Sequence, residues 1–384
     1  MQASDILIVG AGPTGMALGV ALAMRGRAPA IVDARPAGAA AEDKRILALS
    51  HGSRQILQRL GAWERIEATP IRTIHISQQG GFGRTLLHAD DYGVDALGHV
   101  ASAASVAAAL AGRLEELGIA IRHQCRVTNL AAGAADVLVS QDEAAHGTMS
   151  AKLVALAEGA VAQEPETQVV TRDYGQHAVI CTATPARPHG GTAFERFTPH
   201  GPLALLPFRR DHAVVFTVAA DESDALLALD DASFLARLQQ AIGTRVTLTS
   251  VGPRAKYPLL LRYRRDPVGQ RTVWIGNAAQ TLHPVAGQGF NLALRDVWDL
   301  SEALGAIEPE ADPGAAQVLA NYARARRLDR HGVIGFTDTL IRVFSNDVGP
   351  MRIARGGGLA ALDLVPPLKH FVAKRMMFGA RAWP

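Results

Sequence analysis

Three glycines near the N-terminus have the spacing of a phosphate-binding turn. Gly10, Gly12 and Gly15 form a GxGxxG pattern, with Pro13 inside it, between a short apolar run and a stretch of helical character. In such a turn the first glycine allows the tight bend, the second lets a pyrophosphate approach the backbone, and the third lets helix and strand pack closely. Because a helix N-terminus also favours negative charge, the pattern predicts a dinucleotide site.

An acidic residue extends this pattern. Asp33 ends the next apolar run, 18 residues after Gly15, where a carboxylate can accept hydrogen bonds from ribose hydroxyls. The order strand, turn, helix, strand over residues 6–33 is the beginning of a βαβ nucleotide-binding unit. The pattern does not distinguish FAD from NAD, and a purely structural glycine-rich turn is the alternative.

A second glycine-rich segment lies far along the chain. Residues 276–297 read GNAAQTLHPVAGQGFNLALRDV, after an apolar run at 272–275 and leading into a helical stretch at 291–304. We expect Gly287 to Gly289 at the N-terminus of that helix, where free N–H groups and the helix dipole favour negative charge. The reduced isoalloxazine ring of a flavin carries such charge on its pyrimidine edge, so this segment favours FAD.

The elements that must position these motifs suggest two domains. The chain has 384 residues, of which 48% are hydrophobic and 20% charged, as in soluble globular proteins. Residues 101–117 predict a helix, and the short β-type runs between 166 and 264, among them 168–171 and 178–182, predict an inserted, mainly antiparallel domain. The expected division is an FAD-binding domain from 1–70, 100–165 and 265–345, a substrate domain from 71–99 and 166–264, and a basic amphipathic C-terminal region, 346–384.

Composition excludes several classes of protein. The 39 basic and 36 acidic side chains leave a net charge of +3, too small to make nucleic acid an expected partner. Cys125 and Cys181 cannot form a disulfide framework, and the histidines lack the spacing of a metal site, so we expect no metal. With neither a signal peptide nor a membrane-spanning run visible, the sequence favours a cytoplasmic location. A single GxGxxG without a redox cysteine pair argues against a disulfide-reductase type of flavoenzyme.

The segment 276–297 resembles the flavin-contacting signature of group A flavoprotein monooxygenases, specifically the ubiquinone-biosynthesis hydroxylases. The same family resemblance is found in four other stretches, residues 43–63, 173–180, 193–208 and 336–347. The resemblance therefore covers nearly the whole chain. Within this segment, the residues from Gln280 to Pro284 are most similar to the sequence found in the 2-octaprenyl-6-methoxyphenol hydroxylase branch of the family. The resemblance implies an α/β fold: a Rossmann-like FAD-binding domain of the para-hydroxybenzoate-hydroxylase (GR2) type, an inserted mainly antiparallel β substrate domain, and a helical C-terminal region.

The resemblance also implies which residues contact FAD. For the ADP half and its neighbourhood these are Gly10, Gly12, Pro13, Gly15, Asp33, Arg45 and, through its backbone, Val127. For the ribityl chain and the flavin ring they are Gly276, Asn277, Pro284, Gly287, Gln288, Gly289 and Asn291. Asn277 stands where the family commonly has Asp, and its amide keeps an acceptor and adds a donor. Glu158 replaces the Asp of a family segment associated with both FAD and NAD(P)H.

The chemistry implied by the resemblance is ring hydroxylation. NAD(P)H, visiting transiently, reduces FAD; O₂ adds to form a C4a-hydroperoxide; and the terminal oxygen is transferred to an electron-rich phenol. The implied substrate is a polyprenylphenol of ubiquinone biosynthesis, 2-polyprenyl-6-methoxyphenol. Two alternatives stay open: a hydroxylase of a small soluble phenol, and a flavin-binding scaffold subunit among other ubiquinone-biosynthesis proteins. A homo-oligomer is a further possible assembly.

Four residues are candidates for catalysis and substrate binding. His283 and Pro284 are the catalytic candidates, because a histidine there can orient the phenol or relay its proton. The alternative for His283 is a hydrogen bond to backbone only. Arg196 and Phe208 are expected in the substrate wall, with ordinary β-domain packing as the alternative.

The C-terminal part is basic. Residues 321–384 carry 11 basic and four acidic side chains, a net charge of +7. Its last basic residues, interleaved with apolar ones, are Arg352, Arg355, Lys369, Lys374, Arg375 and Arg381. Such a stretch can lie on an anionic membrane surface, so we expect peripheral attachment to the inner face of the cytoplasmic membrane, where a polyprenyl substrate dissolves. The alternative is a helix packed on the FAD-binding domain with a solvated basic face.

Overall fold

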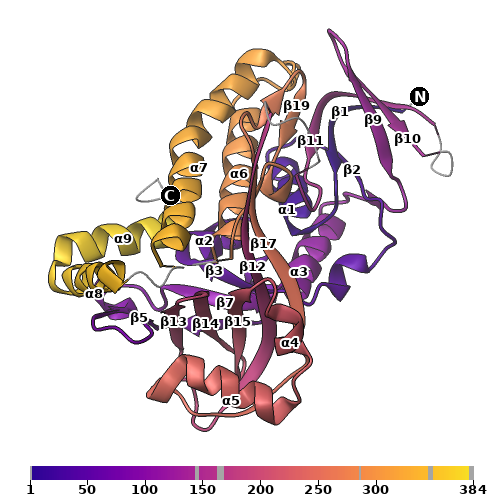
Figure 1. Cartoon of the computed structure of the whole chain (residues 1–384). Coiled ribbons are helices and arrows are strands. Elements are labelled where there is room, and N and C mark those ends of the chain that lie inside the picture. The colour runs from indigo at the N-terminus through magenta and orange to yellow at the C-terminus, as the bar shows by residue number, and fades with distance from the viewer. Residues whose placement is uncertain (1, 143–146, 162–167, 285–286, 345–348, 380–384) are drawn as a thin grey trace.

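The computed structural model describes residues 2–142, 147–161, 168–284, 287–344 and 349–379 (Figure 1). Val285, Ala286 and Arg381, which belong to the segments discussed above, lie outside them. The described strands form an eight-stranded, a nine-stranded and a three-stranded sheet. Helices cover the first sheet and one face of the second.

The first sheet contains the predicted βαβ unit. Its main path runs in the order β18 (Val268–Gly269), β19 (Thr272–Trp274), β11 (Met149–Leu156), β1 (Gln2–Val9), β2 (Ala30–Val32) and β8 (Ile121–Arg122). The strands from β19 to β8 are parallel, whereas β9 (Val127–Ala132) and β10 (Val137–Gln141) extend from β11 as antiparallel neighbours. Ile6 and Ile8 pack on the helical side, and Leu7 and Val9 pack on the side of β10. A strand buried on both faces in this way needs the continuous apolar run that the sequence has.

Four helices complete this domain. They are α1 (Pro13–Ala23), α3 (Ala103–Glu116), α6 (Gln288–Gly305) and α7 (Ala316–Phe344). α1 packs against both α3 and α6, and α6 packs against α7. α6 thereby brings the second glycine-rich segment, from late in the chain, next to the first helix (Figure 1).

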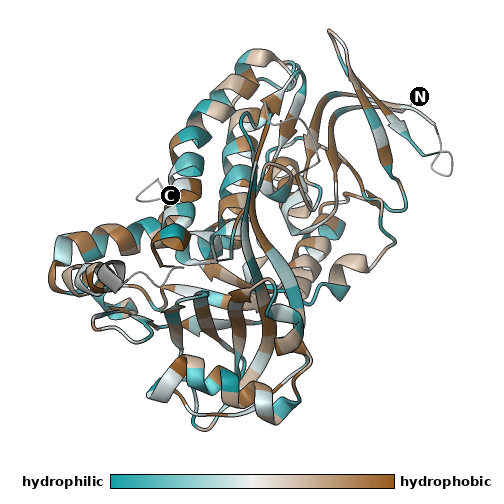
Figure 2. Ribbon diagram, viewed as in Figure 1, coloured by the Kyte–Doolittle hydropathy of each residue, from teal (hydrophilic) through white to brown (hydrophobic). Residues whose placement is uncertain are grey.

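The second sheet is formed largely by the ranges expected for the substrate domain. Its main path runs β20 (Gln280–Thr281), β17 (Ala255–Arg264), β12 (Val169–Pro185), β15 (Asp211–Ala219), β14 (Gly201–Phe208), β13 (Thr192–Thr198), β5 (Thr73–Gln78) and β6 (Arg84–His88), with β16 (Leu248–Val251) beside β12. All pairs are antiparallel except β13 with β5. β20 comes from the segment expected in the FAD-binding domain. α4 (Ser223–Leu227) and α5 (Asp231–Ile242) cover the lower face of these largely hydrophobic strands (Figure 2).

One strand differs from the sequence-based expectation. The two runs expected at 168–171 and 178–182 are parts of a single 17-residue strand, β12. The pairing register shifts between Asp173 and Gln176, and Gly175 has a positive φ of 63°. The glycine therefore marks a bulge, which adds residues on one strand without ending it.

A small sheet and three helices complete the described chain. β3 (Ile46–Ser50), β7 (Gly98–Ser102) and β4 (Ala68–Ile71) form the small sheet, and α2 (His51–Arg59) follows β3. Short 3₁₀ turns occupy Ala39–Glu42, Trp63–Arg65, Ala89–Tyr92, Gly243–Arg245 and Gly276–Ala278. α8 (Gly349–Leu364) packs on β6, and α9 (Pro366–Phe378) packs on α2 and β3. None of the helices in the described ranges is long and apolar enough to cross a bilayer.

Candidate active site

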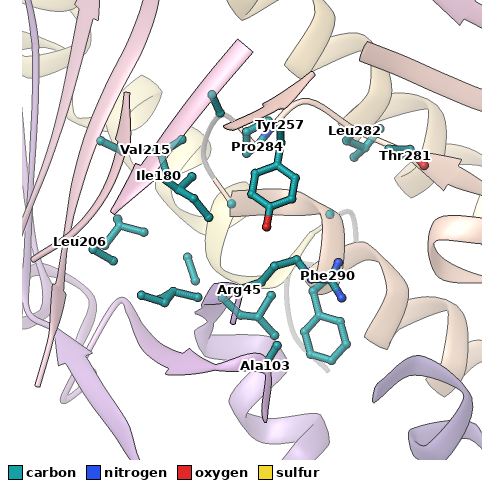
Figure 3. A pocket seen from close by; sticks show the side chains of 18 of the residues that line it. Arg45, Ala103, Ile180, Leu206, Val215, Tyr257, Thr281, Leu282, Pro284 and Phe290 are labelled. Atoms are coloured by element: carbon teal, nitrogen blue, oxygen red, sulfur yellow. The ribbon is translucent and has the colours of Figure 1, made fainter. Parts of the chain in front are cut away.

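A cavity of about 1520 Å³ connects the first glycine-rich turn, the second glycine-rich segment and the second sheet. Cavities for drug-sized ligands typically measure roughly 300 to 1,000 Å³, so this one has room for a dinucleotide together with a second molecule. In Figure 3, Pro284 lies across the cavity from Ile180, Leu206 and Val215 of the sheet, and the ring of Tyr257, from β17 of the same sheet, points into the cavity. Elements from both predicted domains therefore build one site.

The glycines of the GxGxxG turn have two different roles, close packing of the backbone and access for a ligand. A Cβ atom at Gly15 would lie 1.9 Å from the Gly10 carbonyl oxygen, and one at Gly10, whose φ is 103°, would lie 2.9 Å from the Ala157 carbonyl oxygen. A Cβ atom at Gly12 would meet no heavy atom within 4 Å. Gly12 and Pro13 line the cavity at the start of α1. This open side at a helix N-terminus fits a pyrophosphate.

Asp33 lies at the edge of the same turn and is only 4% exposed. Its Oδ2 atom accepts hydrogen bonds from the Ala11 N–H at 2.6 Å and from Arg35 Nη2 at 2.9 Å. Burial opposes ionisation, but the hydrogen bonds from Arg35 and Ala11 outweigh it and hold the pKa of Asp33 below its usual value. The side chain is thus an ionised acceptor in the cavity wall, as a ribose partner requires.

Arg45 and Val127 line the cavity as well. Arg45 follows the 3₁₀ turn and directs its guanidinium into the cavity, where Figure 3 shows it below Tyr257. Its Nε atom lies 2.9 Å from Asp43 Oδ1, an ion pair that holds the side chain in place. Val127 contributes from the first residue of β9.

The second glycine-rich segment supplies the opposite wall. Asn277, Pro284, Gly287 and Gly289 line the cavity. Gly287 is the N-cap of α6 with a φ of 59°, and a Cβ atom there would lie 2.7 Å from the Cβ atom of Ala48. A Cβ atom at Gly289 would meet nothing within 4 Å. The helix N-terminus is therefore open at the position where the family resemblance implies the flavin ring.

Asn291, Gly276 and Gln288 do not line the cavity. The side chain of Asn291 is taken up by protein contacts. Its Oδ1 accepts from the Ser50 N–H and the Ser53 hydroxyl, at 2.8 and 2.6 Å, and its Nδ2 donates to the carbonyl oxygens of Ala48 and Gly287. Asn291 thus ties β3 and α2 to the start of α6 and acts behind the cavity wall.

His283 is also behind the wall. It is 1% exposed, lies edge-on to the Tyr174 ring at 5.7 Å between centroids, and does not line the cavity. Burial lowers the pKa of His283 to about 4, so the ring is neutral near pH 7. This position supports a packing role rather than contact with a phenol. Pro284, its neighbour, faces the cavity (Figure 3).

Arg196 and Phe208 require a correction, because neither lines the cavity. Arg196 points to the α5 side of the sheet, where its Nε atom donates to the Ala241 carbonyl oxygen at 2.8 Å. Phe208 packs in a small apolar cluster with Ile71 and Val100. Side chains alternate across a strand, so the residue next to Arg196, Glu195, faces the cavity instead.

Two further lining residues had no signal as site residues in the sequence, and a third, Glu158, was marked only by the family segment to which it belongs. Cys125 and Cys181 are free, buried cavity residues, and burial raises the pKa of both thiols. Glu158 lines the cavity near Asp33; burial raises its pKa, although Arg126 opposes the shift. Among the described residues, no three His, Cys, Asp or Glu side chains lie together as a metal site.

Comparisons with known proteins agree with this geometry. Residues 3–336 match the family model described as the FAD-binding domain. The chain is 34% identical, over its whole length and 91% of the relative, to the ubiquinone hydroxylase UbiL of Rhodospirillum rubrum. It is 27% identical to the ubiquinone hydroxylase UbiM of Neisseria meningitidis, over 97% of this chain and 84% of that one.

This chain belongs to the FAD-binding hydroxylase family. Solved structures show the same fold: p-nitrophenol 4-monooxygenase PnpA of Pseudomonas putida superposes with a TM-score of 0.80 at 17% identity, covering 99% of this chain and all of that one. The hydroxylase is an FAD-dependent monooxygenase of the ubiquinone-hydroxylase type, with O₂ and NAD(P)H as cosubstrates. The predicted fold class and cofactor are confirmed.

Proposed function

We propose that this hydroxylase acts on the aromatic ring of a polyprenylated phenol, 2-polyprenyl-6-methoxyphenol, in ubiquinone biosynthesis. The observation that carries the proposal is the apolar end of the cavity. Residues of α7, α8 and α9 also line the cavity, and their large apolar members are Phe336, Leu340, Val343, Phe344, Leu359, Leu362, Val372 and Met376. A short polar pocket would suit a small soluble phenol, whereas a long apolar extension suits a prenyl tail.

Different residues of the cavity would bind different parts of FAD and of the substrate. Gly12 and the N-terminus of α1 would hold the pyrophosphate of FAD, Asp33 a ribose, and the N-terminus of α6 the flavin ring. When bound, FAD supplies the redox chemistry that delivers one oxygen atom of O₂ to the ring. Pro284 and the second sheet would enclose the phenol between them and exclude water from it, since both line the cavity.

We also propose that the substrate enters from a membrane. The large exposed apolar side chains on and between α8 and α9 are Ile353, Leu364, Val365, Leu368 and Phe371. Lys374 is exposed beside them on α9, whereas Lys369 forms an ion pair with Asp363 at 3.2 Å. Other residues of the same two helices, among them Leu362 and Met376, line the apolar end of the cavity. A cationic apolar surface next to the tail end of the cavity suits a substrate dissolved in lipid.

The test combines reduction and product analysis. The FAD-loaded protein is mixed anaerobically with NADH or NADPH, with and without 2-geranyl-6-methoxyphenol, and flavin bleaching is followed by absorbance. The aerobic reaction is then analysed by mass spectrometry. We expect phenol-stimulated bleaching, a product heavier by one oxygen atom, and restored ubiquinone in a bacterium that lacks the matching hydroxylase. Bleaching without a hydroxylated prenylphenol would point to another phenol, and no bleaching would point to a scaffold subunit.

A further inference from the structure

One row of side chains crosses the second sheet and faces the cavity. Cross-strand pairing aligns one residue from each of six strands, β5, β13, β14, β15, β12 and β17. In that order they are Ile76, Glu195, Ala204, Val215, Ile180 and Ala255, and all six line the cavity. Glu195 is the one ionisable side chain in this row.

The surroundings of Glu195 are apolar along its own strand as well. Ala193 and Phe197, two residues before and after it on β13, also line the cavity. Figure 3 shows two members of the row, Ile180 and Val215, directed across the cavity toward Pro284. A ring bound between this row and the second glycine-rich segment, called the flavin segment below, would therefore meet Glu195 as the one polar group of the row. Tyr257 and Thr182 are further polar side chains that the sheet contributes to the cavity lining.

The carboxyl group of Glu195 is free to form a hydrogen bond with a ligand bound in the cavity. Its Oε1 atom is buried and has no hydrogen-bond partner among the residues that the structure describes. Burial raises the pKa of Glu195 to about 8, so the group is mainly neutral at pH 7. A neutral carboxyl offers one O–H donor and retains acceptor capacity. A buried polar group without a hydrogen-bond partner costs free energy. A ligand that supplies the missing partner therefore binds more tightly.

We propose that Glu195 binds the ring hydroxyl of the phenol and thereby fixes which ring carbon faces the flavin segment. This assignment rests on the proposed function. A phenol hydroxyl both donates and accepts, and so it matches a neutral carboxyl in both directions, whereas a methyl ether only accepts. Sites built to hydrogen-bond a substrate hydroxyl discriminate strongly against analogues that lack it, because the protein group is then left unpaired.

The experiment compares two ligands in four proteins. The ligands are 2-geranyl-6-methoxyphenol and its O-methyl ether. The proteins are the wild type, Glu195→Leu, Glu195→Gln and the control Glu115→Leu, which changes an exposed carboxylate on α3. Dissociation constants are measured from the perturbed flavin absorbance, and coupling is measured as hydroxylated product per NAD(P)H consumed.

We expect the wild type and Glu115→Leu to bind the phenol about tenfold more tightly than the ether. Glu195→Leu should bring the two affinities within about twofold, through weaker phenol binding alone, and should divert NAD(P)H oxidation toward H₂O₂. Glu195→Gln should keep most of the discrimination, because an amide also donates and accepts. FAD content and thermal unfolding verify that each variant is folded.

The outcomes separate the two proposals. If the wild type hydroxylates the prenylphenol but Glu195→Leu keeps the tenfold preference and full coupling, the role of Glu195 is refuted and the proposed function stands. If the wild type hydroxylates no phenol, both proposals fall together.

Discussion

The Oδ1 atom of Asp296 lies 2.8 Å from the Nε atom of Arg326, and both side chains are almost completely buried. The other oxygen of Asp296 accepts from the Gly276 N–H at 3.1 Å, at the start of the segment that leads to Asn277 and Pro284. One buried ion pair therefore joins α6 and α7 to the flavin segment. The cavity wall thus depends on a charged pair that does not itself line the cavity.

The first prediction concerns Arg326. Its guanidinium also lies 3.1 Å from Asp299 and 2.9 Å from Asp329, so Arg326→Met leaves three buried carboxylates without this cation. Breaking a buried ion pair by removing one partner typically costs about 3–5 kcal/mol, and we expect a loss of that size in the free energy of unfolding. Urea denaturation measures it. Arg324→Met, an exposed arginine on the same helix, is the control and should change stability by less than about 0.5 kcal/mol. Equal stabilities of the two variants would contradict this account.

The second prediction separates two glycines of one motif. Gly12→Val places a side chain in open cavity space and should weaken FAD binding by at least about tenfold, with little effect on the unfolding of the FAD-free protein, because no protein atom lies within 4 Å of the new Cβ. Gly15→Ala forces a Cβ to 1.9 Å from the Gly10 carbonyl oxygen and should lower the stability of the FAD-free protein itself. FAD titration and thermal unfolding of both variants give the comparison. The reverse pattern would show that Gly12 is the packing position.

These glycines also show what the sequence could predict. The GxGxxG turn, Asp33 and the N-terminus of α6 are local patterns, in which the chemistry depends on a few neighbouring residues. The face of β13 is different. Glu195 and Arg196 are adjacent polar residues between Phe194 and Phe197, so alternation alone does not say which one faces the cavity. Pairing with β5, more than 100 residues earlier, sets that face.

The C-terminal helices show a second limit of prediction from the sequence. Their apolar residues have three destinations: Val372 and Met376 line the cavity, Met377 and Phe378 pack against the protein, and Phe371 is exposed. A helical apolar pattern is the same for a lipid surface, a ligand cavity and a protein core, because all three exclude water. The sequence therefore indicated an amphipathic region without dividing its residues among these environments.

The third prediction tests the proposed membrane surface. Leu364→Ser combined with Phe371→Ser removes two apolar side chains that are 78% and 67% exposed, and should weaken binding to anionic liposomes by at least about tenfold. Liposome flotation measures the change. Leu138→Ser, 43% exposed on β10 at the opposite side of the molecule, is the control (Figure 1). Point variants are preferable to deleting the end of the chain, because α9 also contributes buried residues. Unchanged flotation of the double variant would refute the proposed surface.

The fourth prediction follows from the pKa of His283. The unfolded chain binds a proton at this residue near pH 6.5, whereas the folded protein does so only near pH 4. Between these values the unfolded state holds more protons, so stability is full above pH 6.5 and falls as the pH drops toward 4. The full difference is on the order of 3 kcal/mol for this one residue. The buried rings of His99 and His212, with pKa values also lowered to about 4, act in the same direction.

We therefore expect His283→Asn to lose less stability than the wild type between pH 7.5 and pH 5, when urea denaturation is compared at both values. Because the ring of His283 does not line the cavity, this variant should hydroxylate the prenylphenol at pH 7.5 within about twofold of the wild-type rate. A variant that is folded and binds FAD but no longer hydroxylates would give His283 a role in the reaction. An unchanged acid sensitivity would show that other groups dominate it.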